Sequence, residues 1–427
     1  DNELGRNFKS VELQKIHRTS SPALLGLIED LRLDLAVYDS ATEENWDRRI
    51  DMIDDALSSV TMDETADIAS DNSLILFRKT TEVLDALIYF SLKGRRARIR
   101  LPKYPRYFLS WIADLLKFST ESELEILTKN DYELFASLLL QRDSLRFDSE
   151  TAWSYLLEKG GDGEEVSLVK LREKLGSAST RAVEFIVRDF GMIGPVLGNV
   201  HSSKGTESDH VYFLPSRIKK GNLAEESRVL FVGTSRAKKD AFVIDSEVGE
   251  FEEDWKRVSY RYSKKQNTIK SQKFPRIFME LGFDGDYDPY SIVSKYVGSI
   301  KSSQAQRFLE RYWPSSSAGE CFAKYCYDSC EYSIYYQFSS DPEGDNLVHL
   351  GKFSPQLETA LLAACYAHFK FRGHLPARLS LQIVDVATFV ADKHDERLSN
   401  SVAFAAKQGA WLYPVIFSLG PFIYPGR

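Results

Sequence analysis

The sequence lacks several motifs and segments that would indicate a function directly. No G-x-x-x-x-G-K-[ST] segment, the loop that cradles nucleotide phosphates, occurs in its 427 residues, and residues 351–354 lack the upstream glycine. No apolar run approaches the roughly 18 residues that a membrane-spanning helix requires. Four cysteines are too few for a disulfide framework and indicate a reducing, cytoplasmic compartment.

Basic residues are also in the minority. A net charge of −7 excludes a protein that binds nucleic acid through its bulk charge, so a nucleic-acid site must be a local patch. Two segments without acidic residues, 93–106 and 255–276, combine arginine and lysine with tyrosine. This composition suits the backbone of single-stranded nucleic acid. It is equally typical of a solvated strand edge or of a linker.

Two metal-binding patterns are incomplete. Residues 284–288 begin like a calcium loop, but the glycine and the final glutamate of such a loop are missing. Cys321, Cys326 and Cys330 do not have the close pairing that zinc ligands show. The carboxylates in residues 63–66 follow no apolar strand that would place them on a magnesium ion. We therefore expect no metal site on this chain.

Hydrophobic periodicity predicts an α/β fold with a parallel sheet. Residues 73–77 form a continuous apolar run, a helical pattern follows, and residues 97–101 read as the next strand. A strand, a helix and a strand at this spacing form a βαβ unit, whose strands are parallel. Upstream, Ser20 or Ser21 can cap a helix that has Pro22 in its first turn.

The length exceeds that of one ordinary hydrophobic core and predicts more than one domain. A block with helical spacing follows the predicted βαβ unit, with helices expected at 131–141, 149–158 and 167–190. The last part mixes a helix with strand-like runs, at 355–371, 332–338, 379–386 and 411–419. Because the chain begins with aspartate rather than methionine, we expect a piece of a longer protein.

One stretch, residues 199–244, carries a specific pattern. A polar turn that reads HSSKGTE begins at His201 and leads into an apolar strand at 211–214. A second segment, EESRVLFVGTSRAKK, begins at Glu225 and ends in basic residues. These two segments resemble motifs V and VI of the UvrD/Rep family of superfamily 1 DNA helicases, which are written HSxKGxE and EExRLLYVxxTRAK. Residues 11–22, a strand-like run followed by a polar turn and a helix, similarly resemble motif IV of that family.

The resemblance implies an architecture. It predicts a RecA-like parallel sheet with an inserted helical subdomain, followed by an α+β C-terminal domain of unknown role. The expected segments are 1–103 and 196–250 for the RecA-like domain, 104–195 for the insertion, 251–274 for a basic linker and 275–427 for the C-terminal domain.

The resemblance also implies residues that act on ATP. Arg236 and Arg18 fall on arginines that place positive charge on the γ-phosphate during hydrolysis. Glu207, Gly205 and His17 are expected at the nucleotide, although His17 stands where the family usually has an aromatic residue that stacks on adenine. Without the resemblance, each arginine would be interpreted as an ordinary solvated side chain.

A DNA-binding role is implied for His201, Ser202, Ser203 and Lys204. Hydroxyl groups and backbone amides in such a turn can bind a nucleic-acid phosphate. The alternative is a polar turn with no ligand.

The hydrophobic pattern and the family resemblance predict different structures for residues 229–232. Their apolar pattern is typical of a buried strand, whereas the resemblance implies a helix from about Glu225. That helix would carry Arg236 about three turns along, near its C-terminal end.

Together these features predict the C-terminal part of an ATP-dependent 3′–5′ DNA helicase. ATP and Mg²⁺ would be held mainly by a first RecA-like domain, in cis or on a partner chain, so this chain alone would be inactive. Expected partners are single-stranded or partly duplex DNA, with a possible protein partner through residues 275–427. The alternative is a non-catalytic RecA-like scaffold or protein-interaction module. A C-terminal nuclease finds no supporting pattern.

Overall fold

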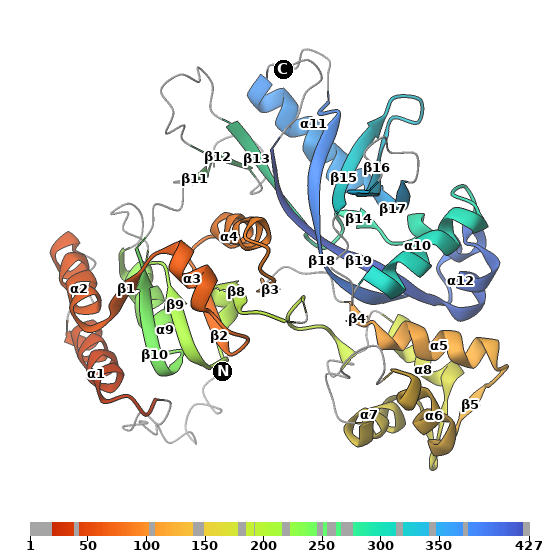
Figure 1. The fold of residues 1–427 in the computed structure, drawn as a ribbon, viewed down its shortest axis with the longest axis horizontal. Coiled ribbons are helices and arrows are strands. Elements are labelled where there is room, and N and C mark those ends of the chain that lie inside the picture. Colours follow the sequence, from red (N-terminus) through yellow and green to blue (C-terminus); the bar gives the residue numbers. More distant parts are fainter. Residues whose placement is uncertain are drawn as a thin grey trace, which may run out of the picture. The chain divides into compact units, whose positions relative to one another are not determined.

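The computed structural model divides the chain into two compact units (Figure 1). The first comprises Asp1–Pro102 and Ile193–Val248, and the second comprises Lys103–Met192 and Gly249–Arg427. The structure describes residues 19–37, 42–101, 107–139, 149–177, 185–191, 193–215, 223–245, 251–253, 262–265, 276–312, 319–340, 347–369 and 375–421.

A six-stranded parallel sheet forms the centre of the first unit. In spatial order its strands are β1 (Ser58–Val60), β10 (Ala237–Ile244), β9 (Ser208–Phe213), β2 (Ser73–Phe77), β8 (Val196–Asn199) and β3 (Arg98–Arg100). All neighbouring pairs are parallel. The predicted α/β fold with a parallel sheet is therefore confirmed. Helix α4 (Thr80–Leu92) connects β2 to β3 as expected, and β8 lies between these two strands.

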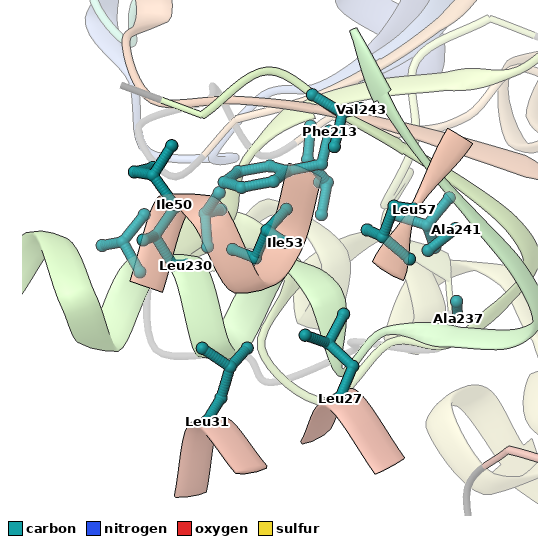
Figure 2. Packing of buried hydrophobic residues seen from close by; sticks show 14 of the residues in the cluster. Leu27, Leu31, Ile50, Ile53, Leu57, Phe213, Leu230, Ala237, Ala241 and Val243 are labelled. Carbon is teal, nitrogen blue, oxygen red and sulfur yellow. The ribbon is translucent and has the colours of Figure 1, made fainter. Parts of the chain in front are cut away.

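Helices cover both faces of this sheet. On one face lie α1 (Pro22–Val37), α2 (Glu43–Ala56) and α9 (Leu223–Thr234). Figure 2 shows Leu31 of α1, Ile53 of α2 and Leu230 of α9 in the same buried cluster as Phe213 of the sheet. Because successive strand residues point to opposite faces, Ile75 lies on the other face, where α4 packs on β2 and β8. Burial on both faces explains the uninterrupted apolar run of β2.

Several local predictions can be compared with the first unit. The helix expected after Ser20 or Ser21 begins at Pro22. Residues 229–232 lie in α9, so the helix implied by the resemblance is confirmed and the strand interpretation of these residues is wrong. Strand β1, which the sequence pattern did not indicate, precedes helix α3 (Met62–Ile68). The strand expected at 11–16 lies outside the described residues.

A buried ion pair links the three helices on the first face. Arg49 of α2 is almost fully buried, and its Nε lies 2.5 Å from Asp34 Oδ2 of α1. Its Nη1 donates to Ser227 Oγ of α9 at 2.6 Å. Arg48 also bonds to Asp34, but its side chain is 39 % exposed, whereas that of Arg49 is 2 % exposed. A buried guanidinium is stable only with such partners, so this network fixes α9 against α1 and α2.

An antiparallel sheet of ten strands dominates the second unit. Nine strands follow in spatial order, and β4 (Phe108–Leu109) adds to β18. The nine are β11 (Phe251–Glu253), β12 (Tyr262–Lys265), β13 (Arg276–Leu281), β19 (Ala410–Pro421), β18 (Arg378–Val390), β15 (Gly319–Cys326), β16 (Glu331–Phe338), β17 (Val348–Phe353) and β14 (Tyr287–Asp288). Its later helices are α10 (Ser299–Tyr312), α11 (Pro355–Phe369) and α12 (Ala403–Gln408). The α+β character expected for this region is confirmed.

The block between the two halves of the first unit is less helical than predicted. Its helices are α5 (Trp111–Glu121), α6 (Lys129–Leu139), α7 (Ser149–Gly160) and α8 (Leu168–Gly176). They accompany a small sheet of β5 (Ile126–Leu127), β7 (Glu165–Ser167) and β6 (Gly161–Asp162). The single helix predicted for 167–190 is wrong, because α8 ends at Gly176 and Ile186 forms a β-bridge with Phe108.

This block packs against the C-terminal region. Thr388 Oγ1 of β18 lies 2.8 Å from the carbonyl oxygen of Leu109, and the amide of Gly191 donates to Asp385 Oδ2 at 2.8 Å. Arg172 of α8 donates to the carbonyl oxygen of Lys407 at 2.7 Å. Residues 103–192 and 249–427 thus fold as one compact unit. The functional division into insertion, linker and C-terminal domain stays a prediction.

The buried ion pair gives a stability prediction. We expect Arg49→Ala to lower the free energy of unfolding by about 3 kcal/mol, because Asp34 then keeps only its bond to the partly exposed Arg48, and Ser227 keeps only its bond to the Leu223 carbonyl oxygen. Arg48→Ala, which removes a guanidinium whose side chain is 39 % exposed and leaves Arg49 on the same carboxylate, should cost only about 1 kcal/mol. Urea unfolding followed by circular dichroism measures both. Equal losses would contradict a specific role for Arg49.

His349 gives a pH prediction for the second unit. Burial, with help from the charges of Lys352 and Lys301, lowers its pKa from 6.5 to about 4. Both folded and unfolded chains hold this histidine neutral above pH 6.5. As the pH falls from about 6.5 to about 4, the unfolded chain binds the proton first, so stability decreases by up to about 3 kcal/mol. Unfolding should therefore depend less on pH in this window in His349→Phe than in wild type, whereas the exposed His394→Phe should behave like wild type.

Candidate functional site

The stretch 199–244 reaches both ends of the parallel sheet. β8 ends at Asn199, which is level with Phe77 of β2. β9 begins at Ser208, two residues before His210, which is level with Ser73. Asn199 therefore lies beside residue 77 of β2, and Ser208 lies beside position 71, just before β2 begins. Six residues at a rise of about 3.3 Å each separate the two positions by about 20 Å. We call the end where the strands begin the amino edge and the other end the carboxyl edge.

Three segments that are distant in sequence meet at the amino edge. Thr19 Oγ1 donates to the carbonyl oxygen of Lys238 at 2.9 Å. The amide of Ser208 donates to the carbonyl oxygen of Arg236 at 3.1 Å. Lys238 Nζ lies 3.9 Å from Glu207 Oε2. The turn after residue 18, the end of the polar turn and the end of the basic segment therefore share one edge. Arg18 itself, like His17, lies outside the described residues.

Arg236 lies two residues beyond the end of α9. Its Nε donates to the carbonyl oxygen of Val232 at 3.0 Å, and its Nη2 donates to Ser235 Oγ at 3.3 Å. The residue is only 7 % exposed. A helix leaves its last four carbonyl groups without intrahelical partners, and a cation there also interacts favourably with the helix dipole. In this structure Arg236 therefore caps the C-terminus of α9.

The polar turn after β8 uses its own hydroxyl groups. It forms a 3-10 helix, Val200–Ser203, in which Asn199 Oδ1 accepts from the amide of Ser202 at 2.8 Å. Ser202 Oγ lies 2.8 Å from the carbonyl oxygen of Asn199 and 3.0 Å from that of Arg100, so its single proton serves one at a time. The buried Ser203 hydroxyl donates to the carbonyl oxygen of Val200 at 2.7 Å. Contact of these serines with DNA stays a prediction.

Gly205 and Lys204 are both exposed in this turn. Gly205 has a φ of +81°, a left-handed conformation that favours glycine, and no atom lies within 4 Å of the place where a Cβ would sit. Lys204 is exposed beside it. The backbone at this point can therefore be approached closely by a ligand.

Arg78, His201 and Glu226 form a cluster at the carboxyl edge. Arg78 directly follows β2, His201 lies in the 3-10 turn after β8, and Glu226 lies in the first turn of α9. Arg78 Nε lies 2.9 Å from both carboxylate oxygens of Glu226, and its Nη2 donates to Oε1 at 2.8 Å. Its Nη1 is 2.9 Å from His201 Nε2.

The electrostatics of the cluster define the state of the histidine. An arginine can only donate, so His201 Nε2 accepts, which requires a neutral ring. Partial burial and the nearby Arg78 charge both lower the pKa of His201. Behind the cluster, Glu82 accepts from the backbone amides of Arg78 and Lys79, while burial raises its pKa. These bonds fix the backbone that presents Arg78.

The basic segment 93–106 is partly engaged within the fold. Lys93 Nζ lies 2.5 Å from Asp63 Oδ1, while Arg95 and Arg98 donate to backbone carbonyl groups. Residues 102–106 and the side chains of 255–276 lie outside the described part. Arg100 of this segment lies at the carboxyl edge, where its carbonyl oxygen is 3.0 Å from Ser202 Oγ. Contact of the two basic segments with DNA stays a prediction.

Sequence reasoning did not assign a role to Arg78 or Glu226. The available signal was position: Arg78 is the first residue after a buried parallel strand, and ligands of open α/β sheets commonly lie beyond the carboxyl ends of such strands. Their pairing across 148 positions has no sequence signature.

Neither similarity to known proteins nor a metal or membrane feature identifies the site. A scan against protein-family models and a search of curated proteins find no match. Within the residues that the structure describes, no three His, Cys, Asp or Glu side chains are grouped so that they could hold a metal ion. No helix of the described part is long and apolar enough to cross a membrane.

The open environment of Gly205 gives a matched pair of variants. Gly205→Ala should cost about 1 kcal/mol, the strain of a left-handed alanine, because nothing crowds its Cβ. Gly194 has a φ of +95°, and its Cβ would lie 2.1 Å from the carbonyl oxygen of Arg96. Gly194→Ala should therefore cost at least about 3 kcal/mol, since strain and overpacking add. Thermal unfolding of the two variants compares them, and similar losses would contradict an open turn at Gly205.

Proposed function

We propose that this chain is the second RecA-like half of a UvrD/Rep-type DNA helicase, an ATP-dependent motor that moves 3′ to 5′ on single-stranded DNA. The arrangement of residues at the amino edge is the observation that supports this proposal. Three segments that resemble motifs IV, V and VI meet there, and the hydrogen bond from Thr19 to Lys238 spans 219 positions. A chance likeness in one segment would not require the other two to lie beside it.

In this proposal the amino edge forms one wall of an ATP site. Arg236 and Arg18 supply positive charge to the γ-phosphate, as a guanidinium can bridge two phosphate oxygens. Glu207, whose side chain is one-third exposed at 33 %, contacts the ribose, with Gly205 and His17 nearby. Arg236 must first exchange its bonds to Val232 and Ser235 for bonds to phosphate. Because an ionic acceptor replaces neutral ones, that exchange is favourable only when ATP is bound.

The phosphates and Mg²⁺ are assigned to another domain. The described residues have no cluster of carboxylates that fits Mg²⁺, and the sequence has no phosphate-binding loop. A first RecA-like domain, in cis or on a partner chain, supplies both. The wider architecture that we propose is a RecA-like domain, 1–103 and 196–250, interrupted by the insertion 104–195 and followed by 275–427. The latter two segments are proposed to contact partly duplex DNA or a protein partner.

A non-catalytic scaffold is the second candidate. The bonds of Arg236 to the end of α9, and those of Ser202 and Ser203 within their turn, favour it. In a scaffold these residues would serve the fold alone, and no nucleotide would depend on them.

Arg236 distinguishes the two candidates. In the longer protein or complex that carries the phosphate-binding loop, we expect Arg236→Ala to lower DNA-stimulated ATP hydrolysis by about three orders of magnitude. Arg236→Lys should recover little, because the ammonium cannot bridge two oxygens. Hydrolysis is measured by phosphate release at saturating ATP.

The matched control is Lys239→Ala, which removes an exposed cation three residues away that pairs with Asp209. It should leave turnover unchanged. Thermal unfolding separates a lost helix cap from a lost catalytic group. Wild-type turnover in Arg236→Ala would contradict the helicase proposal and support the scaffold.

A further inference from the structure

The Arg78 side chain is only partly used by its two partners. Its bonds to Glu226 and His201 employ Nε, one proton of Nη2 and one of Nη1, which is three of the five N–H groups of a guanidinium. The side chain is 26 % exposed, while that of Glu226 is 14 % exposed. The ion pair therefore lies at the surface of the carboxyl edge, within reach of a ligand.

Glu226 neutralises the group that would attract a phosphate. A phosphodiester has the same charge as a carboxylate and the same two-oxygen geometry, so it fits the same edge of Arg78. Glu225 lies in the same helical turn and adds a second negative charge that opposes a phosphate. The described charges that act on His201 are the cations Arg78 and Lys204 and the carboxylates Glu225 and Glu226.

The place of Glu226 in its helix offsets part of the cost of releasing it from Arg78. It lies in the first turn of α9, where backbone N–H groups have no intrahelical acceptor and the helix dipole favours a negative charge. A carboxylate that leaves Arg78 remains stabilised there. The fold thus offers Glu226 a second favourable position, at the N-terminus of its own helix, besides its place on Arg78.

We infer that Glu226 is a gate on the nucleic-acid track: it occupies Arg78 in the DNA-free chain, and a phosphate of single-stranded DNA displaces it. This inference rests on the proposed helicase function and adds a regulatory contact to it. His201, which accepts from Arg78 while neutral, holds the guanidinium in place during the exchange.

The test uses the full chain and a fluorescein-labelled dT oligonucleotide, with anisotropy recorded over a salt series. Glu226→Gln should bind about five- to tenfold more tightly than wild type at low salt, because one charge-assisted bond no longer competes. Glu225→Gln is the matched control, since it removes the same charge from the same turn at a carboxylate that lies 3.9 Å from Arg228 Nη1. It should change affinity less than twofold.

Arg78→Gln completes the cycle. Combined with Glu226→Gln, it should abolish the gain, because the gate acts only through Arg78. The slope of log Kd against log salt should be steeper for Glu226→Gln than for Arg78→Gln, by about 0.7, the value for one phosphate contact on a single strand. Circular dichroism verifies that each variant is folded.

Three results would overturn the gate while wild type still binds DNA. They are equal gains in Glu225→Gln and Glu226→Gln, a gain that persists without Arg78, and weaker binding by Glu226→Gln, which would mean that Glu226 orients Arg78 for DNA. Failure of wild type and all folded variants to bind at low salt has a different meaning. It would overturn the DNA-binding function itself.

Discussion

Parallel strand pairing forces every connection between neighbouring strands to return from one end of the sheet to the other. In the first unit, residues 199–244 therefore contribute side chains to both the carboxyl edge and the amino edge of the sheet. The turn after β8 leaves His201 at the carboxyl edge and delivers Glu207 to the amino edge. Helix α9 then makes the next crossing, with Glu226 at its start and Arg236 just past its end. Two chemically distinct edges thus depend on one topological rule.

The position of α9 depends in turn on a buried charge. Most of the contacts between α9 and its neighbouring helices are apolar and would tolerate small shifts. The bond from Arg49 to Ser227 is directional, and Arg49 is itself held by Asp34. A buried polar network of this kind adds little net stability but selects one arrangement when all its members are satisfied. Both ends of α9 are therefore placed by one buried contact, at the residue that follows Glu226.

Local sequence patterns correctly predicted those elements whose formation depends on neighbouring residues alone. The apolar run of β2 and the proline that begins α1 were read correctly because burial and capping are local properties. The three residues of β1 have no such pattern, and they form a strand only because β10, far along the chain, supplies their partner. The site was predicted only in part for the same reason. The motif resemblance singled out residues of the amino edge, whereas Arg78 and Glu226 are brought together only by folding.

Helix α9 also restricts how the chain can change in length. Ten positions separate residues 226 and 236, and each residue of an α-helix turns by about 100°. One inserted residue between them would rotate Glu226 away from Arg78 whenever Arg236 kept its place. An insertion of a whole turn would restore the direction but displace one end by about 5 Å along the axis. Homologous chains that preserve both edges should therefore vary in the loops around α9 and show no insertions or deletions within it.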